Sequence, residues 1–285
     1  MYSKDITHVI VTGEAPEAYK DVKRIYDLNY HLNKINPELQ VIHYYLNHKV
    51  YKELSSVLKP NFKQERNTVH SLELFLDSPD VEKEELGNEV TLNFFAISSR
   101  GGFMAGSDFK ETPKTELTNS MGIRLDFKRE GKSTKIGYIS GAAWSPLIAH
   151  NLGSCDILIT GFGNTNPNDY GKLNYNETTL GYFGTYTLLE EVKPRLLFCT
   201  EFDGREGDIR LEVTKKLRKE YETANSPSQS LPTILPADNG LFVDLESLRI
   251  ECSVSKTLLD PKDVLVVKTN DTFGGLRYLS PKCLL

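Results

Sequence analysis

Residues 7–18 read THVIVTGEAPEA, and the pattern of this segment indicates the fold class. The β-branched run at 7–12 predicts a short strand, and GEAP at 13–16 predicts a loop. From Glu17 to Leu32 the apolar residues recur roughly at helical spacing, which predicts a helix. The sequence thus opens with a strand, a loop and a helix, a unit typical of α/β folds.

The alternation of strand and helix continues through the sequence. Residues 39–45 predict a strand and 49–58 a helix, and strands at 69–76 and 89–97, separated by an acidic turn, are expected to run antiparallel. The remaining expected elements are a hairpin of 119–127 and 133–140 around residues 129–132, a helix ending at Leu152, a buried strand at 155–160, a long loop at 161–175, a helix at 179–192, a strand at 195–200, a helix at 208–221 and a strand-rich tail.

Composition indicates a folded domain without strong affinity for polyanions. The 285 residues are 39% hydrophobic and 26% charged, enough to bury a sizeable core. We expect one domain over 1–285, with a first half at 1–127 and a second at 128–285. The formal net charge is −5, whereas binding to a polyanion rests on clustered Lys and Arg. Nucleic acid is therefore an unlikely partner.

The cysteines and the apolar segments bear on the compartment. Cys155, Cys199, Cys252 and Cys283 lie far apart in sequence and form no C-x-x-C pair. They indicate neither a zinc knuckle nor a disulfide framework, and we expect reduced, mostly buried thiols. The apolar run in residues 1–13 is too short for a signal peptide, and no later charge-free segment reaches membrane-spanning length. A cytoplasmic protein without a membrane partner is expected.

The order of short motifs over nearly the whole sequence resembles the metallo-β-lactamase-fold hydrolases. In that family a strand ends in T-H-x-H-x-D-H, and residues 12–18 here read TGEAPEA on the same frame. A mid-sequence D-T-G-like turn corresponds to Gly141, and a late H-L-G motif corresponds to Thr179-Leu180-Gly181. The resemblance implies an αββα sandwich.

Two further positions of the resemblance keep carboxylates. Where the family commonly has His-Phe after a strand like RLLFCT, this protein has Glu201-Phe202. Some members carry an acidic residue there, which leaves open whether Glu201 is a feature of a subfamily. The segment PADNGLFVDL at 236–245 resembles the closing segment of the family, with Asp238 intact.

The resemblance also implies that the metal site is vestigial. Its positions are Gly13, Ala15, Glu17, Ala18, Gly141, Thr179, Glu201 and Asp238. Most of these residues offer no donor atom or a poor one, and no histidine falls in a ligand position, whereas a catalytic metal needs imidazoles and carboxylates at fixed places. We predict no metal and no cofactor, although Glu14, Glu17, Glu201 and Asp238 could hold Mg²⁺ or Mn²⁺ weakly.

The position of the first motif has a consequence for assembly. The family has several strands before this motif, but here it begins after about a dozen residues. We therefore expect an N-terminally shortened sandwich whose open sheet edge is covered by rearrangement or by another protein. A homo- or hetero-oligomer is predicted, and an active relative of the same fold is one candidate partner.

These patterns lead to one functional hypothesis and two alternatives. The first is a catalytically inactive domain, not an enzyme, that acts as a subunit, scaffold or ligand sensor. One alternative is a phosphodiesterase or nuclease-like hydrolase with a rearranged carboxylate metal site that also draws on Asp203. Another is a pocket for a small anionic ligand without turnover. The candidate anion-binding residues are Arg100, Arg205 and Arg210.

Overall fold

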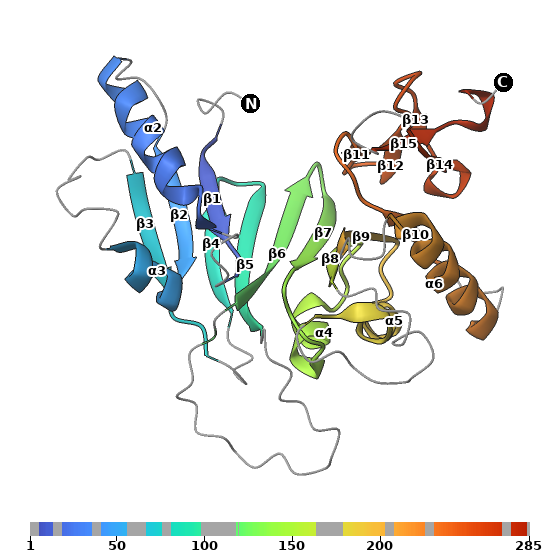
Figure 1. Cartoon of the computed structure of the whole chain (residues 1–285), viewed down its shortest axis with the longest axis horizontal. Helices are drawn as coiled ribbons and strands as arrows, with labels where there is room; N and C mark the ends of the chain where they lie inside the picture. The colour runs from blue at the N-terminus through green and yellow to red at the C-terminus, as the bar shows by residue number, and fades with distance from the viewer. Residues whose placement is uncertain are drawn as a thin grey trace, which may run out of the picture.

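A seven-stranded mixed sheet forms the centre of the protein (Figure 1). The computed structural model describes residues 6–13, 19–35, 41–55, 67–75, 81–97, 118, 120–163, 179–202, 208–225, 231–269 and 275–283. In the order of the sheet the strands are β10 (Thr233–Pro236), β9 (Leu196–Phe202), β8 (Ile157–Gly163), β7 (Lys132–Ile139), β6 (Ser120–Arg129), β5 (Val90–Ile97) and β4 (Glu82–Leu86). Strands β4 to β7 are antiparallel to one another, and β7 to β10 are parallel.

The predicted hairpin is formed by β6 and β7. Its two-residue turn consists of Glu130 and Gly131, whose φ angles are 49° and 78°. Positive φ at both central residues is the geometry that matches the right-handed twist of paired strands. Beyond this hairpin the sheet changes from antiparallel pairing to parallel strands connected by helices.

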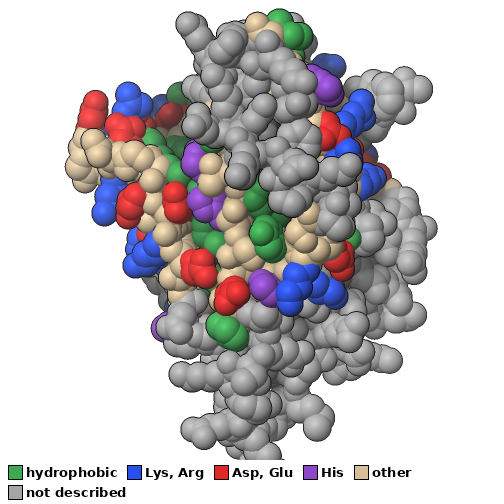
Figure 2. Space-filling view, turned by 90° about the vertical axis from the view of Figure 1, so that its left-hand side faces the viewer, with side chains coloured by type: hydrophobic (Ala, Val, Ile, Leu, Met, Phe, Trp, Pro, Cys, Tyr) green, Lys and Arg blue, Asp and Glu red, His purple; other side chains and the backbone are tan. Residues whose placement is uncertain are grey.

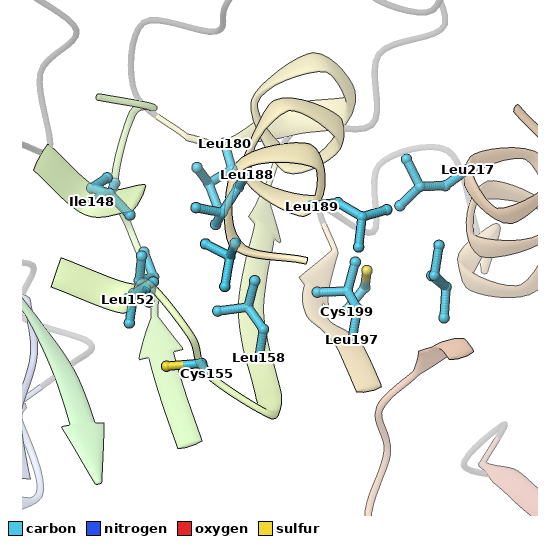
Figure 3. Packing of buried hydrophobic residues seen from close by; sticks show 14 of the residues in the cluster. Ile148, Leu152, Cys155, Leu158, Leu180, Leu188, Leu189, Leu197, Cys199 and Leu217 are labelled. Carbon is cyan, nitrogen blue, oxygen red and sulfur yellow. The ribbon is translucent and has the colours of Figure 1, made fainter. Parts of the chain in front are cut away.

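Three helices cover one face of the main sheet. They are α4 (Pro146–Leu152), α5 (Gly181–Val192) and α6 (Arg210–Ala224). Leu188 and Leu189 of α5 are fully buried and belong to the same hydrophobic cluster as Leu158 and Leu197 of the sheet (Figure 3). Burial of one such leucine contributes about 1.5–3 kcal/mol, so this layer is a major part of the stability. Among the residues that the structure describes, no helix is long and apolar enough to cross a membrane.

The opposite face of the main sheet is covered by a second, divided layer of strands. Over β4 to β6 lies a parallel three-stranded sheet of β1 (His8–Val11), β2 (Ile42–Asn47) and β3 (Asn67–Leu72). Over β8 to β10 lie the C-terminal strands, joined to them in a single hydrophobic cluster. These are β11 (Val243–Asp244), β12 (Arg249–Glu251), β13 (Leu258–Leu259), β14 (Leu265–Lys268) and β15 (Leu276–Leu279), with short 3₁₀ helices η4 (Pro261–Asp263) and η5 (Pro281–Cys283).

The alternation of side chains along β2 explains how the N-terminal sheet packs on both sides. Ile42, Tyr44 and Leu46 pack with helices α2 (Val22–Ile35) and α3 (His48–Ser55). Tyr45 points the other way, and its ring stacks on Phe94 of β5 with centroids 5.1 Å apart. Successive strand residues face opposite sides, so an apolar run such as β2 is buried on both faces. The layers therefore follow the order helix, sheet, sheet, helix, which confirms the expected αββα sandwich.

Three expectations about individual elements are wrong. The acidic segment expected as a turn contains strand β4, whose charged residues lie at an exposed edge of the sheet and give no apolar pattern. Strands β3 and β5 do not pair with each other, because β3 joins β2 in parallel through the connection that contains α3. Residues 161–163, expected in a loop, extend β8, and the Phe162 ring stacks on Phe202 at 5.0 Å.

A row of three histidines crosses the N-terminal sheet. His8, His43 and His70 occupy β1, β2 and β3, with ring centroids 5.2 and 5.5 Å apart. Nδ1 of His43 lies 3.2 Å from Nε2 of His70. Histidine side chains gather near acidic ones on this side of the molecule (Figure 2). Burial and the neighbouring His43 lower the pKa of His8 below its ordinary value of 6.5, and Glu84 opposes this shift.

The lowered pKa of His8 makes folding stability depend on pH. When folding lowers the pKa of a histidine, the histidine stabilises the folded state at pH values above its pKa in the unfolded chain. This contribution is lost as the pH falls below about 6.5. We expect the melting temperature to fall from about pH 7.5 to about pH 5.5, with a smaller fall for His8→Gln. His150→Gln, on the exposed surface of α4, is the control and should keep the wild-type dependence. Equal slopes for His8→Gln and the wild type would contradict this assignment.

Candidate functional site

The carboxyl ends of four parallel strands lie along one edge of the main sheet. Each end carries one residue of interest: Gly141 follows β7, Gly163 ends β8, Glu201 lies near the end of β9, and Asp238 follows β10. The end of β1 is held beside the same sheet, because the Met121 N–H of β6 donates to the Thr12 carbonyl at 2.8 Å. Ligands of α/β sheets bind outside the carboxyl ends of their strands, which makes this edge the candidate site.

Glu201 is the centre of a hydrogen-bonded cluster at this edge. The Tyr138 hydroxyl donates to Oε1 of Glu201 at 2.9 Å, and the Ser140 hydroxyl donates to Oε2. Burial and the Glu201 carboxylate raise the pKa of Tyr138 to about 12, against the opposing effect of hydrogen bonds to Ser140 and Thr12. Tyr138 is therefore a permanent donor near neutral pH. The cluster connects the ends of β1, β7 and β9.

The backbone of Glu201 has an unusual conformation. Its φ angle is 52°, in the left-handed region where a residue other than glycine costs about 1–3 kcal/mol. Gly161 on the neighbouring strand provides the space for the glutamate, because a Cβ there would lie 2.8 Å from Oε2 of Glu201. Strained residues of this kind are often found at functional sites. Glu201 is exposed, so solvent and solutes reach the cluster.

Glycines also shape the rest of the edge. Gly141 and Gly163 have φ angles of 60° and 76°, which allow the backbone to turn sharply beside the cluster. A Cβ on Gly163 would lie 2.4 Å from the nearest atoms of Thr179, so this threonine packs directly on the end of β8. The structure thereby brings Thr179 to the same edge as Gly141 and Glu201.

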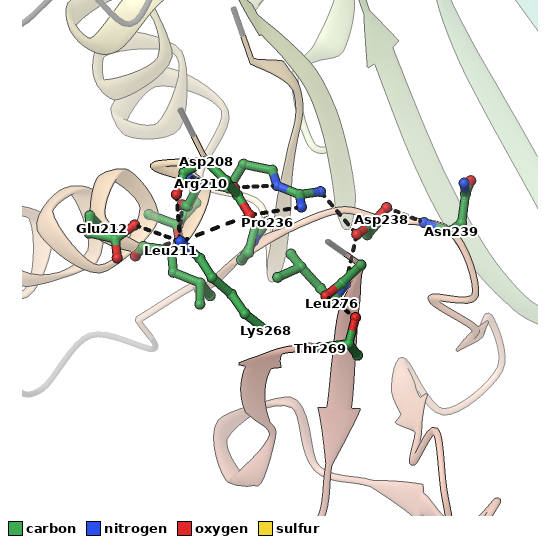
Figure 4. A network of polar contacts seen from close by, with 12 residues as sticks. Asp208, Arg210, Leu211, Glu212, Pro236, Asp238, Asn239, Lys268, Thr269 and Leu276 are labelled. Carbon is green, nitrogen blue, oxygen red and sulfur yellow. Dashed lines mark hydrogen bonds and ion pairs between the residues drawn. The ribbon is translucent and has the colours of Figure 1, made fainter. Parts of the chain in front are cut away.

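Asp238 belongs to a separate polar network (Figure 4). Arg210 donates from Nη1 to Oδ2 of Asp238 at 2.9 Å and from Nε to Oδ1 of Asp208 at 2.8 Å. Asp238 also accepts the backbone N–H groups of Leu276 and Asn239, both at 2.8 Å. Hydrogen bonds from Arg210 lower the pKa of Asp208 and keep it ionised. The network attaches α6 and β15 to the end of β10.

The predicted site residues are thus divided between two places. Gly141, Thr179 and Glu201 lie at the edge that carries the cluster, and Gly13 directly follows Thr12 at the end of β1. Arg210 forms ion pairs with Asp208 and Asp238, which argues against a role in binding an anionic ligand. The other candidate residues lie outside the part of the protein that the structure describes. They are Ala15, Glu17, Ala18, Arg100 and Arg205, together with Glu14 and Asp203.

The sequence-based reasoning missed the hydroxyl donors of the cluster. Tyr138 and Ser140 are two residues apart at the end of β7, so they lie on the same face of the sheet. That spacing could have indicated that the two hydroxyls act together. The sequence of a strand does not show, however, which neighbouring strand supplies their acceptor. Within the ranges that the structure describes, no group of three or more His, Cys, Asp or Glu residues could hold a metal ion.

Comparison with known proteins identifies the architecture. No protein-family sequence model matches the protein, and no curated protein sequence matches it. Among solved structures, the metallo-β-lactamase fold protein YhfI from Bacillus subtilis is similar with a TM-score of 0.52 and 9% identity, over 76% of this protein and 72% of that one. Unliganded yeast PDE1 is similar with a TM-score of 0.55 and 12% identity, over 82% of this protein and 67% of that one.

Sequence identities of 9% and 12% support a shared fold and do not support a shared activity. The two similarities each extend over more than two thirds of this protein, so they concern the layered domain as a whole and not one motif. The protein has the metallo-β-lactamase fold.

Proposed function

We propose that the protein is a non-catalytic metallo-β-lactamase-fold domain that serves as a binding subunit. The observation that carries the proposal is the use of Glu201. Both of its carboxylate oxygens accept hydrogen bonds from protein hydroxyls, at the edge where the resemblance places metal ligands. Such a cluster fixes three strand ends to one another, which is a structural role and requires no ion.

The positions of the three histidines in the N-terminal sheet support the same proposal. Hydrolysis by bound metal requires imidazole and carboxylate ligands around one ion. His8 lies four residues before Thr12 on β1, roughly 13 Å along the strand from the cluster. His43 is in register with His8, and His70 is in register with Tyr45, two residues further along the sheet. None of these three imidazoles takes part in the hydrogen bonds around Glu201.

A rearranged carboxylate hydrolase is the second candidate. The strained backbone of Glu201 favours it, because strain of this kind often accompanies catalysis. The exposed carboxylate also has further lone pairs beyond those used by the two hydroxyls. In this alternative Glu201 would hold a divalent cation together with other carboxylates.

The N-terminal sheet suggests how such a subunit would bind a partner. Within the described residues, no strand pairs with the outer side of β1. The edge strand β4 carries Glu82, Lys83, Glu84 and Glu85, and charges of this kind discourage pairing. Strand β1 (HVIV) carries no such charges, and its only backbone bond to the main sheet among the described residues is at its end, through Thr12. We therefore propose that a partner, either a second copy or a relative, adds a strand to β1.

Metal content separates the two functions. We expect elemental analysis of the protein, purified without a histidine tag, to give far less than one zinc ion per molecule. If zinc is present, the triple variant His8→Gln, His43→Gln, His70→Gln is the control, because it removes the three stacked imidazoles of the N-terminal sheet, which lie outside the proposed site. One or two zinc ions per molecule that persist in this variant would overturn the non-catalytic assignment.

Substitution of Glu201 separates a structural carboxylate from a catalytic one. Glu201→Gln keeps the size but weakens the acceptor of two hydroxyls, so we expect a loss of about 1 kcal/mol in the free energy of unfolding. Tyr138→Phe is the matched variant, and the double variant should lose less than the sum of the two. Hydrolysis of a chromogenic phosphodiester with Mn²⁺ should stay at background in all proteins. Wild-type turnover that Glu201→Gln abolishes would establish the hydrolase instead.

The assembly proposal is tested by mass in solution. We expect light scattering to give a dimer or larger species, or the untagged protein to recover a defined partner from its native host. A protein–protein interface of standard size buries roughly 1,200–2,000 Å² and is large enough to cover β1. A cooperatively melting monomer at all concentrations that recovers no partner would contradict the proposal.

A further inference from the structure

Two cysteines distant in sequence meet in the C-terminal layer. Cys252 directly follows β12, and Cys283 is the last residue of η5. Their sulfur atoms are 3.7 Å apart. A disulfide has a sulfur–sulfur distance of about 2.05 Å, so a small movement of either cysteine would bring the atoms to bonding distance. Neither thiol takes part in the cluster around Glu201.

The surroundings of Cys252 stabilise a thiolate. The residue is fully buried, and its sulfur accepts the backbone N–H groups of Ser255 and Ser280, each at 3.5 Å. Burial raises the pKa of Cys252, but hydrogen bonds from Ser255, Ser280 and Val254 outweigh it and lower the pKa to about 6. The thiolate, not the thiol, is the nucleophile in disulfide exchange. Cys252 is therefore prepared to attack a neighbouring sulfur.

The other buried cysteines provide a contrast. Burial raises the pKa of Cys155 to about 12, and burial raises that of Cys199 to about 12 as well. Both lie in the hydrophobic cluster between the main sheet and its helices. They are protonated at neutral pH and have the environment of structural residues. The pair in the C-terminal layer differs from them in position and in chemistry.

Cys283 gives solutes access to the pair. It is partly exposed, whereas Cys252 is covered. The Cys283 N–H donates to the Ser280 carbonyl at 2.9 Å, and the Ser280 N–H is one of the donors to Cys252. The short segment 280–283 thus holds the exposed sulfur next to the buried one. An oxidant would reach Cys283 first.

We propose that Cys252 and Cys283 form a reversible redox site that is oxidised to an intramolecular disulfide by a small-molecule disulfide. The Cys283 thiolate attacks one sulfur of the oxidant, forming a mixed disulfide and releasing the first small thiolate. The Cys252 thiolate then attacks Sγ of Cys283, forming the internal bond and releasing the second small thiolate. The two protein thiols lose two electrons, which reduce the oxidant to two thiols, and a small dithiol reverses the reaction.

The internal bond would fasten the C-terminal layer to itself. It would close a loop of 31 residue steps between the β12–β13 turn and η5. A crosslink of this length restricts the unfolded state, so oxidation should raise the melting temperature by several degrees. The redox site is independent of the proposed binding function, and its test does not require a partner.

The test uses the full-length protein with oxidised glutathione as the probe. After incubation, remaining thiols are alkylated under denaturing conditions, and peptides are identified by mass spectrometry. We expect a peptide pair joined through Cys252 and Cys283 and a higher melting temperature, both reversed by dithiothreitol. Cys155→Ser is the matched control and should still form the pair. The Cys252→Ser variant should accumulate a mixed disulfide between glutathione and Cys283. The Cys283→Ser variant, which is altered at a partly exposed position, should form no disulfide at either site.

Two results would overturn the proposal. One is a wild-type protein that keeps glutathione on Cys283, because Cys252 would then not act as the second nucleophile. The other is full alkylation of both thiols after oxidation under conditions in which the protein stays folded. The pH dependence gives a second readout, since closure of the internal bond should accelerate with pH and level off just above the pKa of about 6.

Discussion

The parallel half of the main sheet must bury both of its faces, and the rest of the fold depends on this constraint. Parallel strands are covered on both sides in stable proteins. On β9, Leu197 packs toward the helices, whereas Leu196 and Phe198 pack toward the C-terminal strands. One layer of helices cannot satisfy both faces. The C-terminal strands therefore cover the second face of the parallel half, and the N-terminal sheet covers the antiparallel half. At the carboxyl edge of the sheet Glu201 is exposed to solvent.

Most elements could be predicted because apolar spacing indicates them. The hairpin of β6 and β7 and the buried strand that begins at Ile157 follow directly from local pattern. Strand β4 could not be predicted in this way, because Glu82, Lys83 and Glu85 are charged and stabilise an edge without burying an apolar face. The pairing of β3 was missed for another reason. Strand partners are chosen by the connection between strands, which no local pattern specifies.

The sequence grouped three residues that the structure places along one edge, but it did not reveal the contacts around them. The order of motifs located Gly141, Thr179 and Glu201, and the structure puts them along one edge. The bonds from Tyr138 and Ser140 could not be predicted, because they join segments more than sixty residues apart. The left-handed backbone of Glu201 was equally hidden, since glutamate does not favour that conformation. The pairing of Cys252 with Cys283 belongs to the same class of long-range contact.

The hydroxyl cluster at Glu201 also restricts the evolutionary routes open to this domain. A change toward a metal centre would need several new ligands, and one ligand alone binds an ion weakly. Replacing Glu201 first would leave Tyr138 and Ser140 without their acceptor, so stability would fall before any ion was gained. The left-handed backbone and Gly161 would still be shaped for a glutamate. A single substitution at Glu201 would therefore lower the stability of the domain without creating an ion site.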